Sequence, residues 1–401
     1  MKAKKENTVV TGEAEPRTKK AVSLEGFIFI ICFMVFFCAI EHVMGGVNML
    51  NTMMNTAFDL LMNTVFYIMS IAVLAGAVSA LLSEFGVIAL INKLLSPLMK
   101  PLYGLPGAAA IGVVTTYLSD NPAILTLTDD KEFKKYFKKY QLPALTNIGT
   151  AFGMGLIITT FMIGVKSPTG ESFLAAALIG NLGAVIGSVV STRIMLHFTS
   201  KMYGKTDYVI PRAEGEGDAS LATRQIRSGG VGGRFIEAML EGGKSGVSMG
   251  AAIIPGVLVI CTLVMMLTNG ASADGSFTGA AYEGIGLLPM IGAKLDFILK
   301  PIFGFASPQG IAVPITSLGA AGAAIGLVPK LIATGQATAH DIAVFTSMCM
   351  CWSGYLSTHV AMMDGLHYRE ATGKAIISHT IGGLCAGFAA NWLYQLFTLI
   401  F

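Results

Sequence analysis

Long apolar stretches alternate with short polar connections along most of the chain. Seven of them reach the roughly 20 residues that a helix needs to cross the hydrocarbon core of a bilayer. They are 24–44, 57–82, 143–165, 172–196, 246–268, 341–363 and 375–398, and a polar tail, 1–23, precedes the first. The pattern therefore predicts an all-α polytopic membrane protein.

Two further apolar segments are interrupted by polar residues or proline. Segment 106–128 contains Ser119-Asp120-Asn121-Pro122, and segment 307–328 contains Pro314, Thr316 and Ser317. An aspartate facing lipid costs roughly 2.5–3.5 kcal/mol on insertion scales, and proline interrupts a helix. We therefore predict two re-entrant hairpins with polar tips near mid-bilayer, where broken backbone is tolerated only beside protein or water. Amphipathic stretches, expected to be interfacial helices, precede them at 84–100 and 286–300.

The basic residues indicate which side of the membrane each connection faces. With the N-terminus inside and each hairpin re-entering from the side where it starts, 23 of the 27 lysines and arginines lie inside. The four outside are Lys166, Lys294, Lys300 and Lys330. Because cytoplasmic loops carry the excess of basic residues, we expect a multi-pass protein of the bacterial inner (cell) membrane with a cytoplasmic N-terminus.

The second half of the sequence repeats features of the first. Pro101 and Gly104 recur 200 positions later as Pro301 and Gly304, and Ile179-Gly180 recurs 202 positions later as Ile381-Gly382. Each repeat holds three full spans, an odd number, so the second is expected to be inverted. The expected parts are an extra span at 24–44, a first repeat at 57–196, a cytoplasmic linker at 197–245 and a second repeat at 246–401. Inverted repeats with broken helices are typical of secondary transporters.

Composition excludes several other classes. Hydrophobic residues make up 53% of the chain and charged residues 13%, about half the charged fraction of a soluble domain. The net charge of +3 argues against a nucleic-acid partner. The six cysteines lie in apolar stretches without zinc spacing, and the His-Glu-x-x-His pattern of zinc proteases is absent. We therefore expect no metal site, no cofactor and no enzymatic activity.

Two stretches carry a family resemblance. Residues 95–108 resemble the nucleoside recognition (Gate) domain, and 300–308 with 350–359 are similar to its YjiH-type branch. Gate proteins are similar to concentrative nucleoside transporters, which have an interfacial helix, a hairpin and two spans in each inverted repeat. The resemblance, over about 60–400, implies a nucleoside-like or other small polar substrate and ion coupling. It also implies a homo-oligomer or a second Gate-domain subunit.

The chain departs from those transporters at both substrate-binding segments. Their first hairpin carries Gln, Thr and an acidic residue, whereas this one reads Ser119-Asp120-Asn121. Their later broken span carries an acidic ligand, whereas this one offers Ser353, Ser357, Thr358 and His359. The resemblance therefore supports the expected fold more strongly than the expected substrate.

Asp120 is the strongest candidate site residue, because ionisable groups inside a membrane are functional by default. We expect it to bind Na⁺ or to carry a coupled proton; the alternative is a helix cap at the surface.

The expected substrate-binding residues are Asn121, Thr146, Asn147, Gln309, Thr316, Ser317, Ser353, Ser357 and His359. The side-chain amides of Asn121 and Asn147 can both donate hydrogen bonds to a solute and accept them. The alternative is that they hold neighbouring helices together. For His359 and His379 the alternative is a neutral ring bonded to a carbonyl. Trp352 and Tyr355 either stack a base or pack in the core.

Taken together, the sequence predicts a secondary-active transporter of a small polar solute, nucleoside-like by resemblance, with alternating access through two opposed hairpins. Its expected partners are the lipid bilayer, the solute and a further subunit, with Na⁺ or H⁺ as coupling ion. The alternative is a non-transporting membrane scaffold or receptor subunit of a Gate-domain complex.

Overall fold

The computed structural model describes residues 20–211, 226–272 and 274–400, and nearly all of their regular structure is helical. Six of the described helical segments are long and apolar enough to span a membrane. They are Leu24–Met44 (α1), Gly46–Glu84 (α2, Gly46–Asp59, continuing into α3, Phe66–Glu84), Ala144–Gly164, Leu174–Tyr203 (α10), Val231–Thr268 (α11, Val231–Ala252, continuing into α12, Thr262–Thr268) and Arg369–Ile400, which contains α18 (Thr372–Ile400). The all-α polytopic fold is confirmed.

The elements of the first half recur in the same order in the second. After α3 come α4 (Val87–Leu98), α5 (Ala109–Leu118), α6 (Ala123–Asp129), α7 (Lys131–Lys134), α8 (Ala144–Thr150), α9 (Gly155–Gly164) and α10. After α12 come α13 (Leu287–Phe303), α14 (Ala312–Ser317), α15 (Ala321–Ala333), α16 (Ala339–Cys351), α17 (Tyr355–Gly365) and α18. Opposite membrane orientation of the halves stays a prediction from the basic residues.

The ends of the two amphipathic helices are held in the same way. Near Gly104, Arg193 of α10 donates to the carbonyls of Pro101 and Leu102. Near Gly304, Asn391 of α18 donates to the carbonyl of Ile302 at 2.9 Å. Because the last carbonyls of a helix lack partners within it, each long C-terminal helix satisfies the end of the amphipathic helix in its own half.

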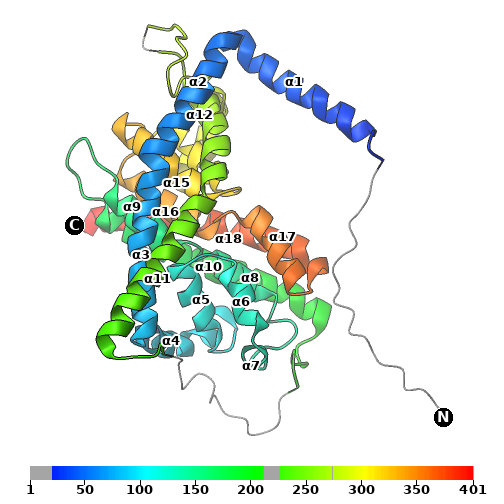
Figure 1. The fold of residues 1–401 in the computed structure, drawn as a ribbon. Helices are drawn as coiled ribbons and strands as arrows, with labels where there is room; N and C mark the ends of the chain where they lie inside the picture. Colours follow the sequence, from blue (N-terminus) through cyan, green and yellow to red (C-terminus); the bar gives the residue numbers. More distant parts are fainter. Residues whose placement is uncertain (1–19, 212–225, 273, 401) are drawn as a thin grey trace, which may run out of the picture.

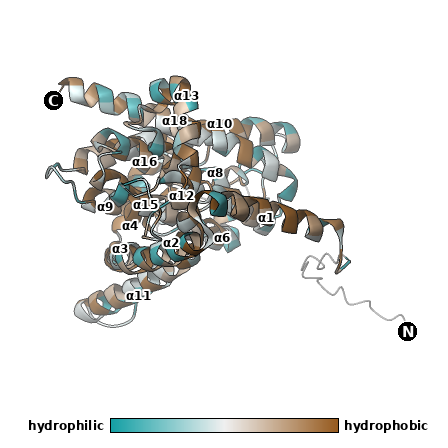
Figure 2. Cartoon of the chain, turned by 90° about the horizontal axis from the view of Figure 1, so that it is seen from above, coloured by the Kyte–Doolittle hydropathy of each residue, from teal (hydrophilic) through white to brown (hydrophobic). Residues whose placement is uncertain are grey.

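The sequence placed two boundaries wrongly. Residues 45–56, expected as an outer connection, lie mostly in α2, which continues into α3, and only Gly45 at φ 80° separates α2 from α1. The stretch contains no proline, so nothing prevents it from forming a helix. The expected linker 197–245 is shorter, because α10 continues to Tyr203 and α11 begins at Val231; its central residues 212–225 lie outside the described part. Helix α1 extends away from the body, and its surface is strongly hydrophobic (Figures 1 and 2).

Helices α3 and α11 lie side by side along the molecule (Figure 1). A Cβ atom on Gly242 would lie 2.3 Å from the Gly76 carbonyl oxygen, and one on Gly246 would lie 2.3 Å from that of Ala72. Such close approach maximises van der Waals contact, which holds helices together where lipid gives no hydrophobic driving force.

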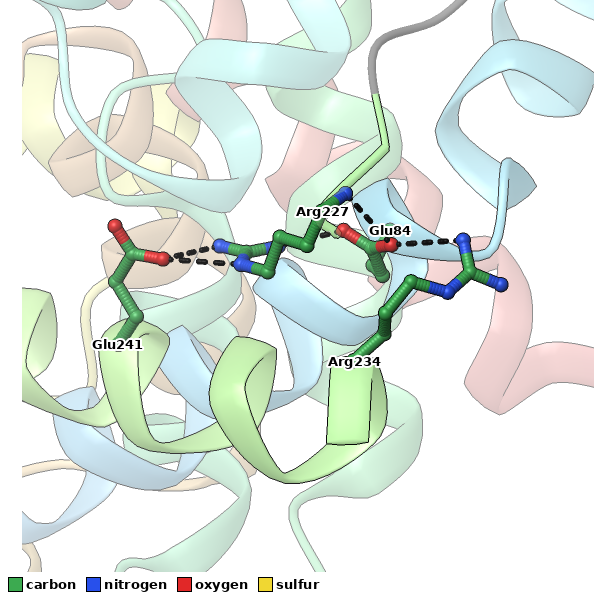
Figure 3. Close-up of polar contacts among 4 residues, drawn as sticks. All are labelled: Glu84, Arg227, Arg234 and Glu241. Carbon is green, nitrogen blue, oxygen red and sulfur yellow. Dashed lines mark hydrogen bonds and ion pairs between the residues drawn. The ribbon is translucent and has the colours of Figure 1, made fainter. Parts of the chain in front are cut away.

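A cluster of charged side chains fastens the same pair at one end (Figure 3). Glu84, at the end of α3, is 4% exposed. It accepts hydrogen bonds from Arg227 Nη1 at 2.7 Å and from Arg234 Nη1 at 3.1 Å, and Arg227 also binds Glu241. Removing one partner from such a cluster leaves a buried charge uncompensated, so the pairing fixes the start of α11 against the end of α3.

Glu283 organises the loop between α12 and α13. Its buried carboxylate accepts hydrogen bonds from the hydroxyls of Ser272 and Thr278, both at 2.7 Å, and from the Gly279 amide at 2.9 Å. Burial alone would raise its pKa, but these donors lower the pKa to about 2. The carboxylate form therefore stabilises the folded loop.

The first prediction concerns the α3–α11 contact. Gly242→Ala places a methyl group against the backbone of α3, so we expect it to lower the free energy of unfolding by about 1–3 kcal/mol, as overpacking does. Gly243→Ala is the matched control, because its Cβ would lie 3.6 Å from Val73. Thermal unfolding in detergent measures both; equal melting temperatures would contradict the packing described.

The second prediction concerns pH. The folded-state pKa of Glu283 lies below its ordinary value of 4.5, so its contribution is complete above pH 4.5 and is lost as the pH falls towards about 2. Glu283→Gln puts an amide donor opposite the loop donors and lowers the melting temperature above pH 4.5. The difference from the wild-type chain shrinks below that pH. A difference that stays constant from pH 7 to pH 2.5 would refute the assignment.

Candidate functional site

Two of the segments expected to span the membrane are broken in the middle. Helices α8 and α9 are separated at Ala151–Met154, and α16 and α17 at Trp352–Gly354. Met154 (φ 55°) and Gly354 (φ 62°) adopt left-handed conformations at these breaks, which stops each helix and starts the next. The sequence predicted spans at 143–165 and 341–363, and the structure breaks both of them. At Gly354 the left-handed conformation favours glycine.

The two predicted hairpins consist of short helices. In the first, Ser119–Pro122 connects α5 to α6; in the second, Leu318–Ala320 connects α14 to α15. At 1.5 Å per residue, the ten residues of α5 measure about 15 Å, half of the roughly 30 Å hydrocarbon core. An arm of this length reaches about the middle of the bilayer, which fits the expected position of the first tip.

Hydrogen bonds join the hairpin tips to the second helix break. From the first tip, Asn121 Nδ2 donates to the Ser353 carbonyl at 2.7 Å. The second tip offers the Ser317 carbonyl, which accepts from the Gly354 amide at 3.0 Å. The first break lies alongside, because a Cβ on Gly153 would lie 1.5 Å from Asn121 Oδ1. All four interruptions of the backbone therefore meet at one place.

A cavity of about 180 Å³ lies at this meeting point. Both tips, both breaks and the C-terminal end of α11 contribute to its wall. Its lining residues are Asp120, Asn121, Met154, Met249, Ala252, Ile253, Gly256, Gly319, Ala320, Ala321, Gly322, Ala323, Ser353, Gly354, Ser357 and Thr358.

Some polar groups at the cavity have hydrogen-bond partners, and others have none among the described residues. Asp120 Oδ1 accepts the Asn121 backbone amide at 2.7 Å, and among the described residues no cation lies within ion-pair distance of the carboxylate. Asn121 is 1% exposed and its Oδ1 has no partner. A buried acceptor without a partner costs about 1–3 kcal/mol, but this oxygen packs against Gly153 of the first break, where a Cβ would lie 1.5 Å away. The charged group that the cavity presents is therefore Asp120.

The structure separates the predicted site residues into two groups. Asp120, Asn121, Ser353 and Ser357 line the cavity. The others do not: Thr146, Asn147 and His359 are fully buried elsewhere, Thr316 and Ser317 bond to carbonyls of their own hairpin, and Gln309 lies at the start of the second hairpin. Trp352 and Tyr355 are also buried outside the cavity lining.

Asn147 belongs to a buried network beside the cavity. Its Nδ2 donates to Ser191 Oγ at 2.8 Å and to Ser378 Oγ at 3.0 Å. Ser191 Oγ lies 2.9 Å from His379 Nδ1, and His379 Nε2 bonds to the carbonyl of Cys351, the last residue of α16. Because a carbonyl only accepts, Nε2 carries the proton and Ser191 donates to Nδ1. The expected neutral ring on a carbonyl is what His379 shows, and the network fixes the second break from behind.

His359 differs from His379. Neither of its ring nitrogens has a partner, and its ring packs 4.6 Å from that of His379 and 5.7 Å from that of Tyr355, measured between centroids. It lies behind the cavity wall with no hydrogen-bonding role in the structure.

Sequence reasoning missed several wall residues. Met154 and Met249 carry no chemical signal, and the small residues from Gly319 to Ala323 contribute backbone. It also overlooked Gly246–Gly250, which matches the Gly-x-Ser-x-Gly pattern of a nucleophile elbow. An elbow needs a sharp turn between strand and helix, whereas this segment lies inside α11 and Ser248 Oγ bonds to the Lys244 carbonyl. The segment therefore lacks the geometry of an elbow.

Comparisons with known proteins identify the fold. No family model and no curated protein matches the chain. Solved structures of the concentrative nucleoside transporter CNTnw do. A variant in an outward-facing state is 15% identical, with a TM-score of 0.55 over 93% of this chain and 86% of that one. An inward-facing, substrate-bound structure is 14% identical, with a TM-score of 0.53 over 92% of this chain and 85% of that one. The chain therefore shares the fold of those transporters.

The third prediction tests the contact between the first tip and the first break. Gly153→Ala drives a methyl group into Asn121, so we expect a fall of about 1–3 kcal/mol in the free energy of unfolding. Gly319→Ala, at the cavity wall with no atom nearer than 3.7 Å, is the control. In an Asn121→Ala background the same Gly153→Ala change should cost less than half as much. Additive effects in this double-mutant cycle would show that the two residues are not in contact.

Proposed function

We propose that the protein is a secondary-active transporter of a small polar solute, which binds between the two hairpin tips. The observation that carries the proposal is the meeting of two tips and two helix breaks around one small cavity that contains the carboxylate of Asp120. Transporters place their sites where discontinuous helices meet near the bilayer midplane. A scaffold has no need for four costly interruptions at one point.

A row of cavities along α11 and α12 supports a path through the molecule. A cavity of about 470 Å³ includes Glu241 and Met249, the central cavity includes Met249 and Gly256, and a cavity of about 480 Å³ includes Met265. From Glu241 to Met265 the helix rises about 36 Å, which is close to the thickness of a membrane. Met249 lines two of the three cavities, so its side chain lies between them.

Ion coupling is assigned to Asp120. The residue lines the central cavity beside the unpartnered Asn121 oxygen. A carboxylate in that position can hold Na⁺ with neighbouring oxygens, or it can carry a proton. Two likenesses suggest a nucleoside-like solute: the resemblance of the sequence to the Gate domain, and the shared fold with CNTnw, a nucleoside transporter.

The fourth prediction tests transport. The purified full chain in proteoliposomes should take up a labelled polar solute faster under an inward Na⁺ or H⁺ gradient than without one. A panel of nucleosides, amino acids and short peptides covers the candidate solutes. Asp120→Asn, which keeps the shape but removes the charge, should abolish the effect of the gradient.

The control is Asp364→Asn, an exposed carboxylate outside the cavity lining, which should leave coupled uptake unchanged. Coupled uptake by Asp120→Asn would show that the ion role is wrong. Absence of uptake for the whole panel, with a correctly folded protein, would favour the scaffold or receptor subunit.

A further inference from the structure

The second hairpin turns the beginning of a helix towards the central cavity. Helix α15 begins at Ala321, and its first three residues, Ala321, Gly322 and Ala323, are buried in the cavity wall. No side chain caps this end, and among the described residues no backbone acceptor receives their amides. The first amides of a helix need partners outside it, and with the helix dipole they favour a negative charge.

Asp120 supplies the opposite charge to the same cavity. It follows the carboxyl-terminal end of α5, where the helix dipole is negative and favours a cation. Among the described residues no cation pairs with its carboxylate, whose Oδ1 accepts only the Asn121 backbone amide. One small cavity therefore presents donors for an anion from the second hairpin and acceptors for a cation from the first.

The size and the wall of the cavity argue against a nucleoside. Its volume of about 180 Å³ is below the roughly 300–1,000 Å³ typical of pockets for drug-sized ligands. No aromatic side chain lines it, and Trp352 and Tyr355 are buried in the core, so the wall offers no ring on which a base could stack.

We propose that the transported solute is a small zwitterion, an α-amino acid or a compound with the same pair of charged ends. Its carboxylate accepts from the free amides of α15, and its ammonium group binds the carboxylate of Asp120. The hydroxyls of Ser353, Ser357 and Thr358 complete the wall. This inference rests on the proposed transport function and narrows its solute.

Binding to the full chain in detergent tests the solute class separately from transport. The probes are labelled glycine, L-alanine and L-serine, with alaninamide, propionate, ethylamine and uridine as competitors. We expect at least one of the three amino acids to bind, and each analogue that lacks one charged end to compete at least tenfold more weakly, because a hydrogen bond to a charged group is worth about that factor or more.

Ala321→Pro tests the helix end directly, because it removes one amide. Proline is well tolerated at the first position of a helix, and the preceding Ala320 already has the extended backbone that proline requires (ψ 113°). The variant should reduce the preference for alanine over alaninamide about tenfold, because the missing donor binds a charged carboxylate more strongly than the neutral carbonyl of alaninamide. Ala339→Pro is the matched control, at the first position of α16 after the extended Thr338 and outside the cavity lining.

The outcomes separate the two proposals. Uptake of uridine without binding of any amino acid would overturn the zwitterion assignment and leave transport standing. Binding of an amino acid without uptake would support the site and count against transport. An unchanged alanine preference in Ala321→Pro would show that α15 does not hold the carboxylate, and this result would also overturn the assignment.

Discussion

The need to satisfy backbone hydrogen bonds inside the membrane governs this structure. Hydrocarbon offers no partner for a free N–H or C=O group, so breaks in a helix survive there only beside protein or a polar cavity. Four such breaks meet in the part of the chain that the structure describes, and they bond to one another: the Gly354 amide donates to the Ser317 carbonyl, and Asn121 donates to the Ser353 carbonyl. At the start of α15, the amides of Ala321, Gly322 and Ala323 have no acceptor among the described residues, and these residues line the central cavity. The site is thus a direct consequence of where the helices stop.

Two kinds of packing hold this arrangement in place. Glycines let α3 and α11 touch backbone to backbone, and the cluster around Glu84 fastens them at one end. On the other side of the cavity, Asn147, Ser191 and His379 form a buried network that reaches the end of α16. A packed helix pair and a satisfied polar network are both stiff, so the cavity lies between firm walls.

The sequence predicted what hydrophobicity and charge determine. Apolar length located most spans, and Asp120 with Asn121 marked the first hairpin tip, because a polar cluster within an apolar segment is too costly to face lipid. The breaks at Met154 and Gly354 were harder to find, since one glycine in an apolar run does not distinguish a left-handed residue from close packing. Asn147 and His359 drew attention as buried polar residues, but only tertiary contacts show that they lie behind the wall. The amides of α15 left no signal, because backbone groups are the same in nearly every residue.

The measurement that tests the central claim most directly is the sidedness of the hairpin ends. Single cysteines at Lys100 and Lys131 flank the first hairpin, and single cysteines at Lys300 and Thr334 flank the second; all four positions are exposed. In a background without the native cysteines, a membrane-impermeant thiol reagent should reach the first two from the cytoplasmic side and the last two from the outer side. If the two ends of either hairpin react from opposite sides, that segment crosses the membrane, and the central cavity between two opposed tips does not exist.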